Sequence, residues 1–257
     1  MLHSMSLLTP NEPAALTIER PQGISDFLLV CDHASRLIPR SLGALGLDEV
    51  QLASHVAWDI GAASVARKLS ALLDATLVLQ NYSRLVIDCN RPPGSPTSIP
   101  TQSEYARITG NDGLTPAAAS ERVAAIFAPY HAAVSALLDE RRDANRRTLL
   151  VAVHSFTPVY LGKARPWHTG LMFRHDRRLG HSLLERLRAD TELTVGDNEP
   201  YAISDTTDHT LPAHGESRQL AHVGIEIRQD LVADEAGQTA WAARLAQALA
   251  QAARQFS

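Results

Sequence analysis

Cysteine is scarce in this chain of 257 residues, which holds only 2, Cys31 and Cys89. Each lies within an apolar stretch that predicts a strand, so we expect two buried thiols and neither a disulfide nor a metal ligand. A chain without disulfides is typical of a reducing compartment. We therefore predict a cytoplasmic protein.

The chain also lacks a strong excess of charge and any long apolar run. Its formal charge is −4 and its aromatic content is 5%, which gives no general attraction to nucleic acid or to acidic membranes. No stretch approaches the ~18 apolar residues of a membrane span. Residues 1–5 lack the basic start and apolar core of a signal peptide. We expect neither nucleic acid nor a membrane among its partners.

Glycine-rich phosphate loops, internal repeats and low-complexity tracts are absent as well. Neither GxGxxG nor GxxxxGK followed by Ser or Thr occurs, so the chain carries no signature of a phosphate-binding loop. A chain of this length can form one large α/β domain or two small ones. Because no linker divides it, we expect a single domain over residues 1–257.

The chain does contain three strand-like runs that carry polar side chains in similar places. Residues 149–153 are all apolar, as in a strand buried on both faces, and His154 and Ser155 follow directly. Residues 27–31 repeat this arrangement and lead into His33. In residues 223–228, alternation places Glu226 and Arg228 on one face. Open α/β sheets hold ligands at the carboxyl ends of such strands.

Two strand-end histidines and a strand-borne carboxylate suit a hydrolytic zinc site. In such a site, neutral imidazoles and a carboxylate hold the metal, and a separate Glu takes a proton from water. The alternative for each histidine taken alone is an ordinary hydrogen-bonded side chain at a strand end. No single element of the pattern is specific, but the combination on three strands favours the metal site.

The order of the predicted elements indicates an α/β fold with a mainly parallel sheet covered by helices on both sides. The expected strands are 15–18, 27–31, 76–79, 84–89, 149–153, 170–173 and 222–228. The expected helices are 60–73, a long helix from 115 that Pro129 kinks near 125–127, 176–189 and 236–254. Two irregular segments, 92–114 and 196–220, are long, and a loop of such length is often a functional lid or a mobile segment.

A charged pair lies inside the predicted strand 84–89. Alternation puts Arg84 and Asp88 on one face of a strand that otherwise looks buried, and buried charges are costly unless they are paired. One interpretation is that the two side chains satisfy each other. The other is that the strand delivers Asn90 and Arg91 to a cleft, where an Arg fork holds a substrate carboxylate through two parallel hydrogen bonds.

Six short segments between about residues 30 and 230 carry a resemblance to a known family. They are Cys31-Asp32-His33-Ala34-Ser35 with Ile38-Pro39, His55-Val56-Ala57-Trp58-Asp59-Ile60-Gly61-Ala62, Ser83-Arg84-Leu85-Val86-Ile87-Asp88-Cys89-Asn90-Arg91, His154-Ser155-Phe156-Thr157-Pro158, Gly196-Asp197-Asn198-Glu199-Pro200-Tyr201 and Ile225-Glu226-Ile227-Arg228-Gln229-Asp230. In these segments the chain resembles the N-formylglutamate amidohydrolase family.

The resemblance implies a fold and a metal site. The family is distantly similar to zinc carboxypeptidases, which implies a phosphorylase/hydrolase-like fold: a central mixed sheet between helices, with a metal held at the strand ends, here by His33 and His154. Zinc carboxypeptidases carry a Glu three residues after the first ligand, where this chain has Arg36. Because an Arg is no metal ligand, Asp59 is the best candidate for the missing carboxylate. Its alternative role is the N-cap of helix 60–73.

The resemblance also implies a reaction. We expect a hydrolase, dependent on Zn²⁺ or another divalent metal, that cleaves the linear amide of a small carboxylate-bearing N-acyl amino acid, with N-formyl-L-glutamate as the first candidate. Glu226 looks like the general base, and Asn90 with Arg91 looks like the pair that grips the substrate carboxylate.

Further residues of the expected site come from its surroundings. Arg84 would assist at the oxyanion, and Glu199, Tyr201 and His214 would close over the substrate. Two alternatives remain open from the sequence. One is a peptidase or deacylase of the carboxypeptidase type with a different acyl group, and the other is a small-molecule binding protein that has kept the cleft and lost the metal.

Overall fold

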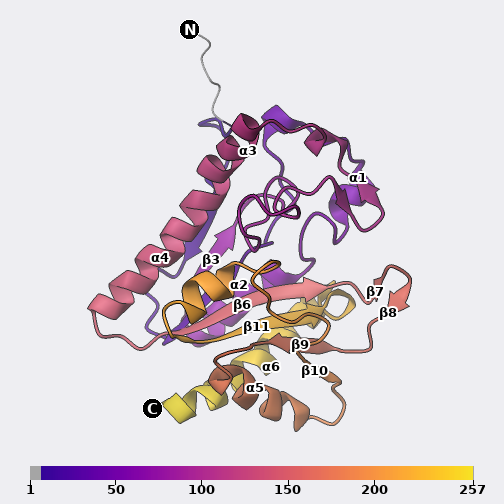
Figure 1. The fold of residues 1–257 in the computed structure, drawn as a ribbon. Helices are drawn as coiled ribbons and strands as arrows, with labels where there is room; N and C mark the ends of the chain where they lie inside the picture. Colours follow the sequence, from indigo (N-terminus) through magenta and orange to yellow (C-terminus); the bar gives the residue numbers. More distant parts are fainter. Residues whose placement is uncertain (1–6, 257) are drawn as a thin grey trace.

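The computed structural model describes residues 7–256 and is built around a seven-stranded sheet (Figure 1). Its strand order is β1 (Leu16–Glu19), β3 (Thr76–Gln80), β2 (Phe27–Cys31), β6 (Leu149–Phe156), β11 (Ala221–Arg228), β9 (Thr169–Met172) and β10 (Val195–Asp197). The four strands from β3 to β11 are parallel, β1 and β9 pair antiparallel with their inner neighbours, and β10 is parallel to β9. The predicted mixed, mainly parallel sheet is confirmed.

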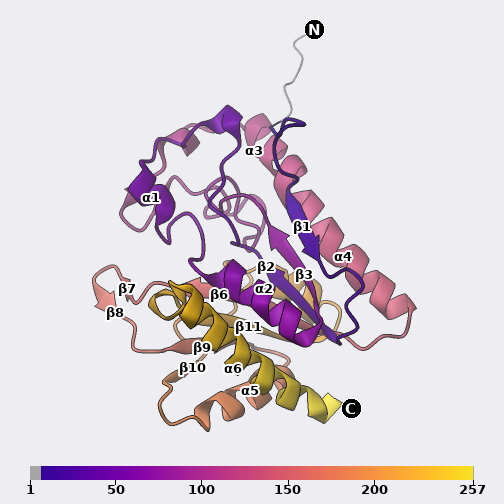
Figure 2. The same cartoon turned by 180° about the vertical axis from the view of Figure 1, so that it is seen from behind.

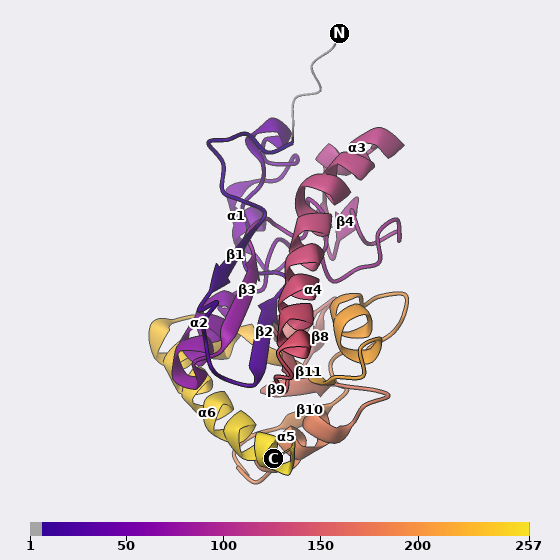
Figure 3. The same cartoon turned by 90° about the vertical axis from the view of Figure 1, so that its left-hand side faces the viewer.

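Helices cover both faces of this sheet (Figures 2 and 3). α2 (Ala62–Leu73), α5 (Arg178–Arg188) and α6 (Glu235–Ala253) lie on one face, and α4 (Ala128–Asp143) lies on the other. The shorter helices are α1 (Glu49–Ala53), α3 (Pro116–Arg122), η1 (Arg40–Leu42), η2 (Thr109–Asn111), η3 (Val123–Phe127), η4 (Leu211–Glu216), η5 (Gln229–Val232) and η6 (Arg254–Phe256). Among residues 7–256, no helix combines the length and the apolar character that crossing a membrane requires.

Alternation along the strands divides the apolar side chains between two cores. Val151 and Val153 of β6 pack in the core with α2, α5 and α6, whereas Leu150 and Ala152 pack in the core with α4. Successive side chains of a strand point to opposite faces, so His154 continues the series on the α4 side. This histidine therefore faces the layer that also contains the long loops.

The long helix predicted from residue 115 is interrupted where Pro129 requires it. Thr115 caps α3, its hydroxyl accepting the backbone N–H of Ala118 at 3.2 Å. A π-helical segment, η3, separates α3 from α4 over Val123–Phe127. Proline lacks an N–H and its ring clashes with the preceding turn, which accounts for an irregular turn just before Pro129. At the place of the predicted kink, the helix changes its type.

The prediction of a strand over residues 84–89 is wrong. The chain turns here, with the N–H of Val86 donating to the carbonyl of Ser83 at 3.0 Å and the N–H of Asp88 donating to the carbonyl of Ser98 at 2.8 Å. Leu85 and Val86 are buried in the core with α4. Because loops bury this segment, it contains the same run of apolar residues that a strand within the sheet would have.

The alternative role of Asp59, as the N-cap of the following helix, is not seen. α2 begins at Ala62, and its N-cap is Gly61, which adopts the left-handed region at φ 79° and gives no side-chain cap. A Cβ at Gly61 would lie 2.3 Å from the carbonyl oxygen of Val232, so this tight turn needs glycine. The Asp59 carboxylate is left available for other contacts.

Loops form the rest of the structure above the strand ends. The long segment 92–114, predicted to be irregular, contains a small hairpin of β4 (Gln102–Ser103) and β5 (Ala106–Arg107). A second hairpin is made by β7 (Val159–Tyr160) and β8 (Lys163–Ala164). The two cysteines are buried and free, as predicted.

Two glycines of neighbouring strands leave room for the loop after β10. A Cβ on Gly170 would lie 1.8 Å from the carbonyl oxygen of Glu199, and a Cβ on Gly196 would lie 2.3 Å from the same atom. Any larger residue at either position would displace this loop. The backbone of Glu199 therefore lies directly against the sheet.

Candidate active site

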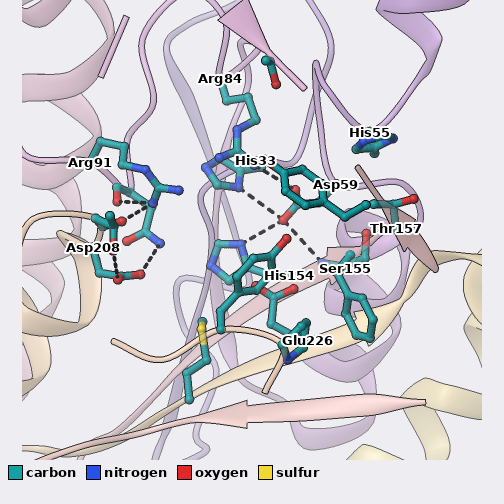
Figure 4. A pocket seen from close by; sticks show the side chains of 18 of the residues that line it. His33, His55, Asp59, Arg84, Arg91, His154, Ser155, Thr157, Asp208 and Glu226 are labelled. Carbon is teal, nitrogen blue, oxygen red and sulfur yellow. Dashed lines mark hydrogen bonds and ion pairs between the residues drawn. The ribbon is translucent and has the colours of Figure 1, made fainter. Parts of the chain in front are cut away.

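A pocket of about 440 Å³ opens at the carboxyl ends of β2 and β6 (Figure 4). Most of its charged and polar lining comes from strand ends and from the loops above them. The lining residues are His33, His55, Asp59, Arg84, Asn90, Arg91, Ser103, Glu104, His154, Ser155, Phe156, Thr157, Tyr160, Met172, Pro200, Tyr201, Ala202, Thr207, Asp208 and Glu226. The crevice outside the strand ends is where α/β sheets bind ligands.

Three predicted metal ligands, His33, Asp59 and His154, converge at the floor of this pocket. All three are buried, and one potential ligand atom of each lies within 4.8 Å of the others. The Nδ1 of His154 is 2.9 Å and the Nδ1 of His33 is 3.2 Å from Oδ2 of Asp59. Residues 121 positions apart along the chain thus direct their Nδ1 atoms at one carboxylate oxygen.

The far side of each imidazole meets another buried carboxylate. The Nε2 of His33 donates to Oδ1 of Asp88 at 2.7 Å, and the Nε2 of His154 lies 3.3 Å from Oδ2 of Asp32. Asp32 is held in turn by the hydroxyls of Tyr130 and Thr210, which donate to its Oδ1 at 2.8 and 2.9 Å. Carboxylates placed behind metal-binding histidines fix the ring orientation and leave the other nitrogen free for the metal.

This donor set fits a divalent cation. When Nε2 carries the proton, Nδ1 of the neutral imidazole is unprotonated and can only accept a hydrogen bond. The Asp59 oxygen that both Nδ1 atoms face is also an acceptor, so no hydrogen bond can form between them. A cation or additional protons must lie among them. Burial and Arg84 oppose protonation of His33, but Asp88 and Asp59 outweigh them and raise the pKa of its ring. Burial likewise opposes protonation of His154, but Asp32 and Asp59 raise the pKa of that ring well above 6.5.

Backbone contacts hold the three segments in place. The N–H of Asp59 donates to the carbonyl of His33 at 3.0 Å. The hydroxyl of Ser155 donates to the carbonyl of Ile60 at 2.7 Å. The loop that carries Asp59 is therefore tied to both strand ends, and the spacing of the three side chains does not depend on their own contacts alone.

Glu226 reaches the same pocket from the middle of the sheet. It lies opposite His154 in the parallel pairing of β11 with β6. The side chain is 6% exposed, and its Oε2 has no hydrogen-bond partner among residues 7–256. Burial raises the pKa of Glu226 to about 7, although His154 acts in the opposite direction. A carboxylate in this position can exchange a proton near neutral pH. Arg228, on the same strand, binds Asp230 at 2.8 Å and forms no ion pair with Glu226 within residues 7–256.

Arg84 lines the pocket, and each of the two terminal nitrogens of its guanidinium faces a carboxylate. Its Nη2 donates to Oδ2 of Asp88 at 2.8 Å, and its Nη1 is 3.6 Å from Oδ1 of Asp59. Arg84 and Asp88 do pair, as the first of the two interpretations has it, although the pair spans a turn and not a strand. Asp88 therefore links Arg84 to His33, a role that the sequence did not indicate.

Asn90 and Arg91 also line the pocket, but their side chains differ in their hydrogen-bond partners. The Oδ1 of Asn90 accepts the backbone N–H groups of His209 and Thr210, each at 3.1 Å. Arg91 donates through Nη1 to the carbonyls of Asn90, at 3.1 Å, and Thr207. Within the described chain, no carboxylate forms an ion pair with Arg91.

The three residues expected to close over a substrate occupy different places. Tyr201 lines the pocket, and its hydroxyl accepts a hydrogen bond from Arg165 at 2.8 Å. Glu199 is exposed and does not line the pocket. His214 is buried in η4, where its Nε2 lies 2.8 Å from Nδ1 of His131 on α4. The π-helical turn of η4 directs His214 into the α4 layer, away from the pocket.

Two lining residues that were given no role from the sequence form a pair at the pocket wall. The Oε2 of Glu104 lies 2.6 Å from Nε2 of His55. Its Oε1 accepts the backbone N–H of Leu161 at 2.8 Å. Glu104 thereby joins the β4–β5 hairpin to the β7–β8 hairpin. His55 stands in a segment that resembles the family, but nothing in the local pattern of Glu104 pointed to this contact.

Imidazoles and a carboxylate grouped beside a buried, unpaired glutamate define a hydrolase-type site. A family model described as N-formylglutamate amidohydrolase matches residues 25–233. The chain belongs to the N-formylglutamate amidohydrolase family, and it is an enzyme that hydrolyses amide C–N bonds. The resemblance noted in the sequence is confirmed.

Solved structures are similar over almost the whole chain. A gene product of Agrobacterium tumefaciens is 43% identical with a TM-score of 0.94, and the match covers 97% of this chain and 99% of that one. An N-formylglutamate amidohydrolase from Ralstonia eutropha is 20% identical with a TM-score of 0.68, covering 95% and 100% of the two chains. No curated protein matches the sequence.

Proposed function

We propose that this amidohydrolase uses a divalent cation, Zn²⁺ in the first instance, to hydrolyse the amide of a small N-acyl amino acid that carries a carboxylate. His33, Asp59 and His154 would hold the cation. The observation that carries the proposal is the convergence of two Nδ1 atoms on Oδ2 of Asp59, at 2.9 and 3.2 Å. Both rings are backed by buried carboxylates, which supports ligation and not an isolated hydrogen bond.

When bound, the cation would supply Lewis acidity and would lower the pKa of a water molecule toward neutrality. Glu226 takes a proton from the attacking water as its oxygen bonds to the acyl carbon. As the C–N bond breaks, Glu226 passes this proton to the departing nitrogen, so that one water is consumed and an acid and an amine are formed. Burial and the pKa of about 7 suit Glu226 to both transfers.

Arg91 would hold the carboxylate of the substrate. It lines the pocket, and its Nη1 is fixed by the carbonyls of Asn90 and Thr207. A guanidinium fixed in this way loses little further entropy when it binds a carboxylate. The amide of Asn90 is occupied with the backbone of the loop above, so we assign Asn90 to positioning that loop.

A test combines metal analysis with substrate screening. The purified chain should bind about one Zn²⁺, and the zinc-loaded protein should hydrolyse members of a panel of N-acyl amino acids, with N-formyl-L-glutamate as the first compound. Chelation should abolish turnover, and added zinc should restore it. The variant His154→Ala should lose both properties, whereas His181→Ala, which removes an exposed histidine of α5, should keep them. Zinc-free turnover, or no affinity for divalent ions, would contradict the proposal.

A further inference from the structure

Arg165 follows the β7–β8 hairpin, and its side chain lies among three aromatic rings. Its guanidinium carbon is 4.6 Å from the ring centre of Tyr160, 4.8 Å from that of Tyr201 and 5.9 Å from that of Phe156. All three aromatic residues line the pocket, although Arg165 itself does not. Stacking on aromatic rings holds a guanidinium in place without neutralising its charge. Arg165 is therefore a fixed positive charge beside the pocket.

The charge of Arg165 is not paired with a carboxylate. Within residues 7–256 its side chain has one hydrogen-bond partner, the hydroxyl of Tyr201, to which Nη1 donates at 2.8 Å. A guanidinium has five N–H donors, so the others are left for a ligand. The Tyr201 oxygen accepts this bond, and the proton of the hydroxyl has no acceptor among the described residues. A carboxylate can thus accept from Arg165 and from Tyr201 together.

The hydroxyl of Tyr201 connects Arg165 with the site of the proposed chemistry. Burial and the charge of Glu226 raise the pKa of Tyr201, whereas Arg165 and Arg84 act in the opposite direction. Glu226 and Arg84 both line the pocket, so Tyr201 lies near the charges inside the pocket as well as near Arg165. A ligand bound at this hydroxyl would therefore lie within the pocket.

Most other charged groups of the pocket face one another, and the proposed cation would lie among those at its floor. The close pairs are His33 with Asp59, His154 with Asp59, Arg84 with Asp88, and His55 with Glu104. Arg91 and Arg165 differ from Arg84, because no carboxylate of residues 7–256 pairs with either of them. Two carboxylates of one substrate can therefore be bound without separating any of these pairs.

Arg91 and the hairpin that precedes Arg165 lie on opposite sides of the proposed metal-binding group. In Figure 4, Arg91 lies on one side of this group and Thr157 on the other. The hydroxyl of Thr157 donates to the carbonyl of Val159 in β7 at 2.9 Å, and the backbone N–H of Arg165 closes the hairpin by donating to the carbonyl of Pro158 at 2.8 Å. A substrate whose amide lies at the metal-binding group can thus extend one carboxylate toward each arginine.

We propose that Arg165 is a specificity-determining residue, which binds a carboxylate on the side chain of the substrate together with the hydroxyl of Tyr201. Arg91 binds the other carboxylate, that of the amino-acid backbone. The inference rests on the proposed function and assigns the recognition of an acidic side chain to this residue. An uncharged side chain would leave Arg165 without an anion, and charge-assisted hydrogen bonds are stronger than neutral ones, so the arginine favours an acidic substrate over a neutral one of the same shape.

The test compares N-formyl-L-glutamate with N-formyl-L-glutamine, which have nearly the same shape and differ by one charge. In the zinc-loaded wild type, kcat/KM should be at least about tenfold higher for the glutamate compound. Arg165→Gln should lose this preference, whereas Arg165→Lys, which keeps the charge but loses the fork, should keep part of it. The matched control is Arg244→Gln, because Arg244 stacks on Trp241 of α6 at 5.1 Å and lies outside the pocket. This variant should keep the preference of the wild type.

Two results would overturn the assignment. One is a wild type without preference for the glutamate compound. The other is Arg165→Gln with the preference unchanged, including an equal loss of kcat/KM for both compounds, which would mean that Arg165 only holds Tyr201 in place. Calorimetric binding of both compounds to the chelator-treated proteins separates this inference from the proposed reaction. If neither compound is hydrolysed, but the wild type binds the glutamate compound more tightly and Arg165→Gln does not, the proposed reaction fails while the role of Arg165 stands.

Discussion

Replacing Glu226 with Gln tests the proposed chemistry through two effects of opposite sign. Gln keeps the shape of the side chain, but it cannot take up and release a proton. Turnover should therefore fall by about 10²–10⁴-fold, the usual contribution of a positioned acid–base group. Zinc content should stay the same, because the proposed ligands are His33, Asp59 and His154.

The same substitution should stabilise the metal-free protein at neutral pH. Burial raises the pKa of Glu226 from 4.5 to about 7, which corresponds to about 3 kcal/mol. Because the pKa is higher in the folded state, the stability linked to this group is fully present below pH 4.5 and is lost as the pH rises through about 7. Gln carries no charge at any pH. The free energy of unfolding of the variant should therefore exceed that of the wild type by an amount that grows with pH to about 3 kcal/mol.

Urea denaturation of the chelator-treated proteins at about pH 5 and pH 8 measures this difference. Comparing the variant with the wild type cancels the titration of those carboxylates and histidines that do not interact with Glu226, which excludes His154, Asp59 and His33. A difference that does not change with pH would show that the Glu226 carboxylate is not destabilised in the folded protein. Loss of zinc from the variant would make Glu226 a ligand, and unchanged turnover would remove it from the mechanism.

Three further substitutions probe the surrounding site. His154→Ala should remove the metal and abolish turnover while circular dichroism shows an intact fold; full zinc content and activity would place the metal elsewhere. Asp32→Asn should weaken zinc binding by about 10–100-fold, measured by competition with a chelating dye, because it loosens the orientation of His154; an unchanged affinity would mean that Asp32 serves only to bind the hydroxyls of Tyr130 and Thr210. Arg91→Lys should raise KM for carboxylate substrates by about tenfold, equivalent to ~1.4 kcal/mol, because the fork is lost; an unchanged KM in steady-state assays would make Arg91 structural.

The central strands could be predicted from the sequence because a sheet that is covered on both faces requires apolar residues on both faces of its strands. Strands β2 and β6 are covered on both faces, so an unbroken apolar run marks each of them, over residues 27–31 and 149–153, whereas β11 alternates Ile225 and Ile227 with Glu226 and Arg228. Polar residues at the ends of such runs stand out, and this is why His33 and His154 could be placed at one edge of the sheet.

Residues outside the sheet were harder to place, because several structures produce the same local pattern. The run around Asp88 is buried by loops, and its apolar character therefore suggested a strand that does not exist. In the sequence Asp59 stands where a helix cap would stand, and only the start of α2 at Ala62, with Gly61 as its N-cap, excludes that role. His214 and Glu104 depend on contacts across 83 and 49 residues of sequence. No short-range signal carries such information.

The close approach of the Glu199 carbonyl to Gly170 bears on how such a pocket can be redesigned or diversify. Gly170 lies opposite Glu226 in the pairing of β9 with β11, so one strand position borders both the carboxylate that we propose as the proton carrier and the loop that carries Tyr201. A single added methyl group there would push that loop outward without touching the histidines on the far strands. A substitution at Gly170 in β9 can thus change the size of the pocket by moving this loop, while the residues proposed to perform the chemistry remain unchanged.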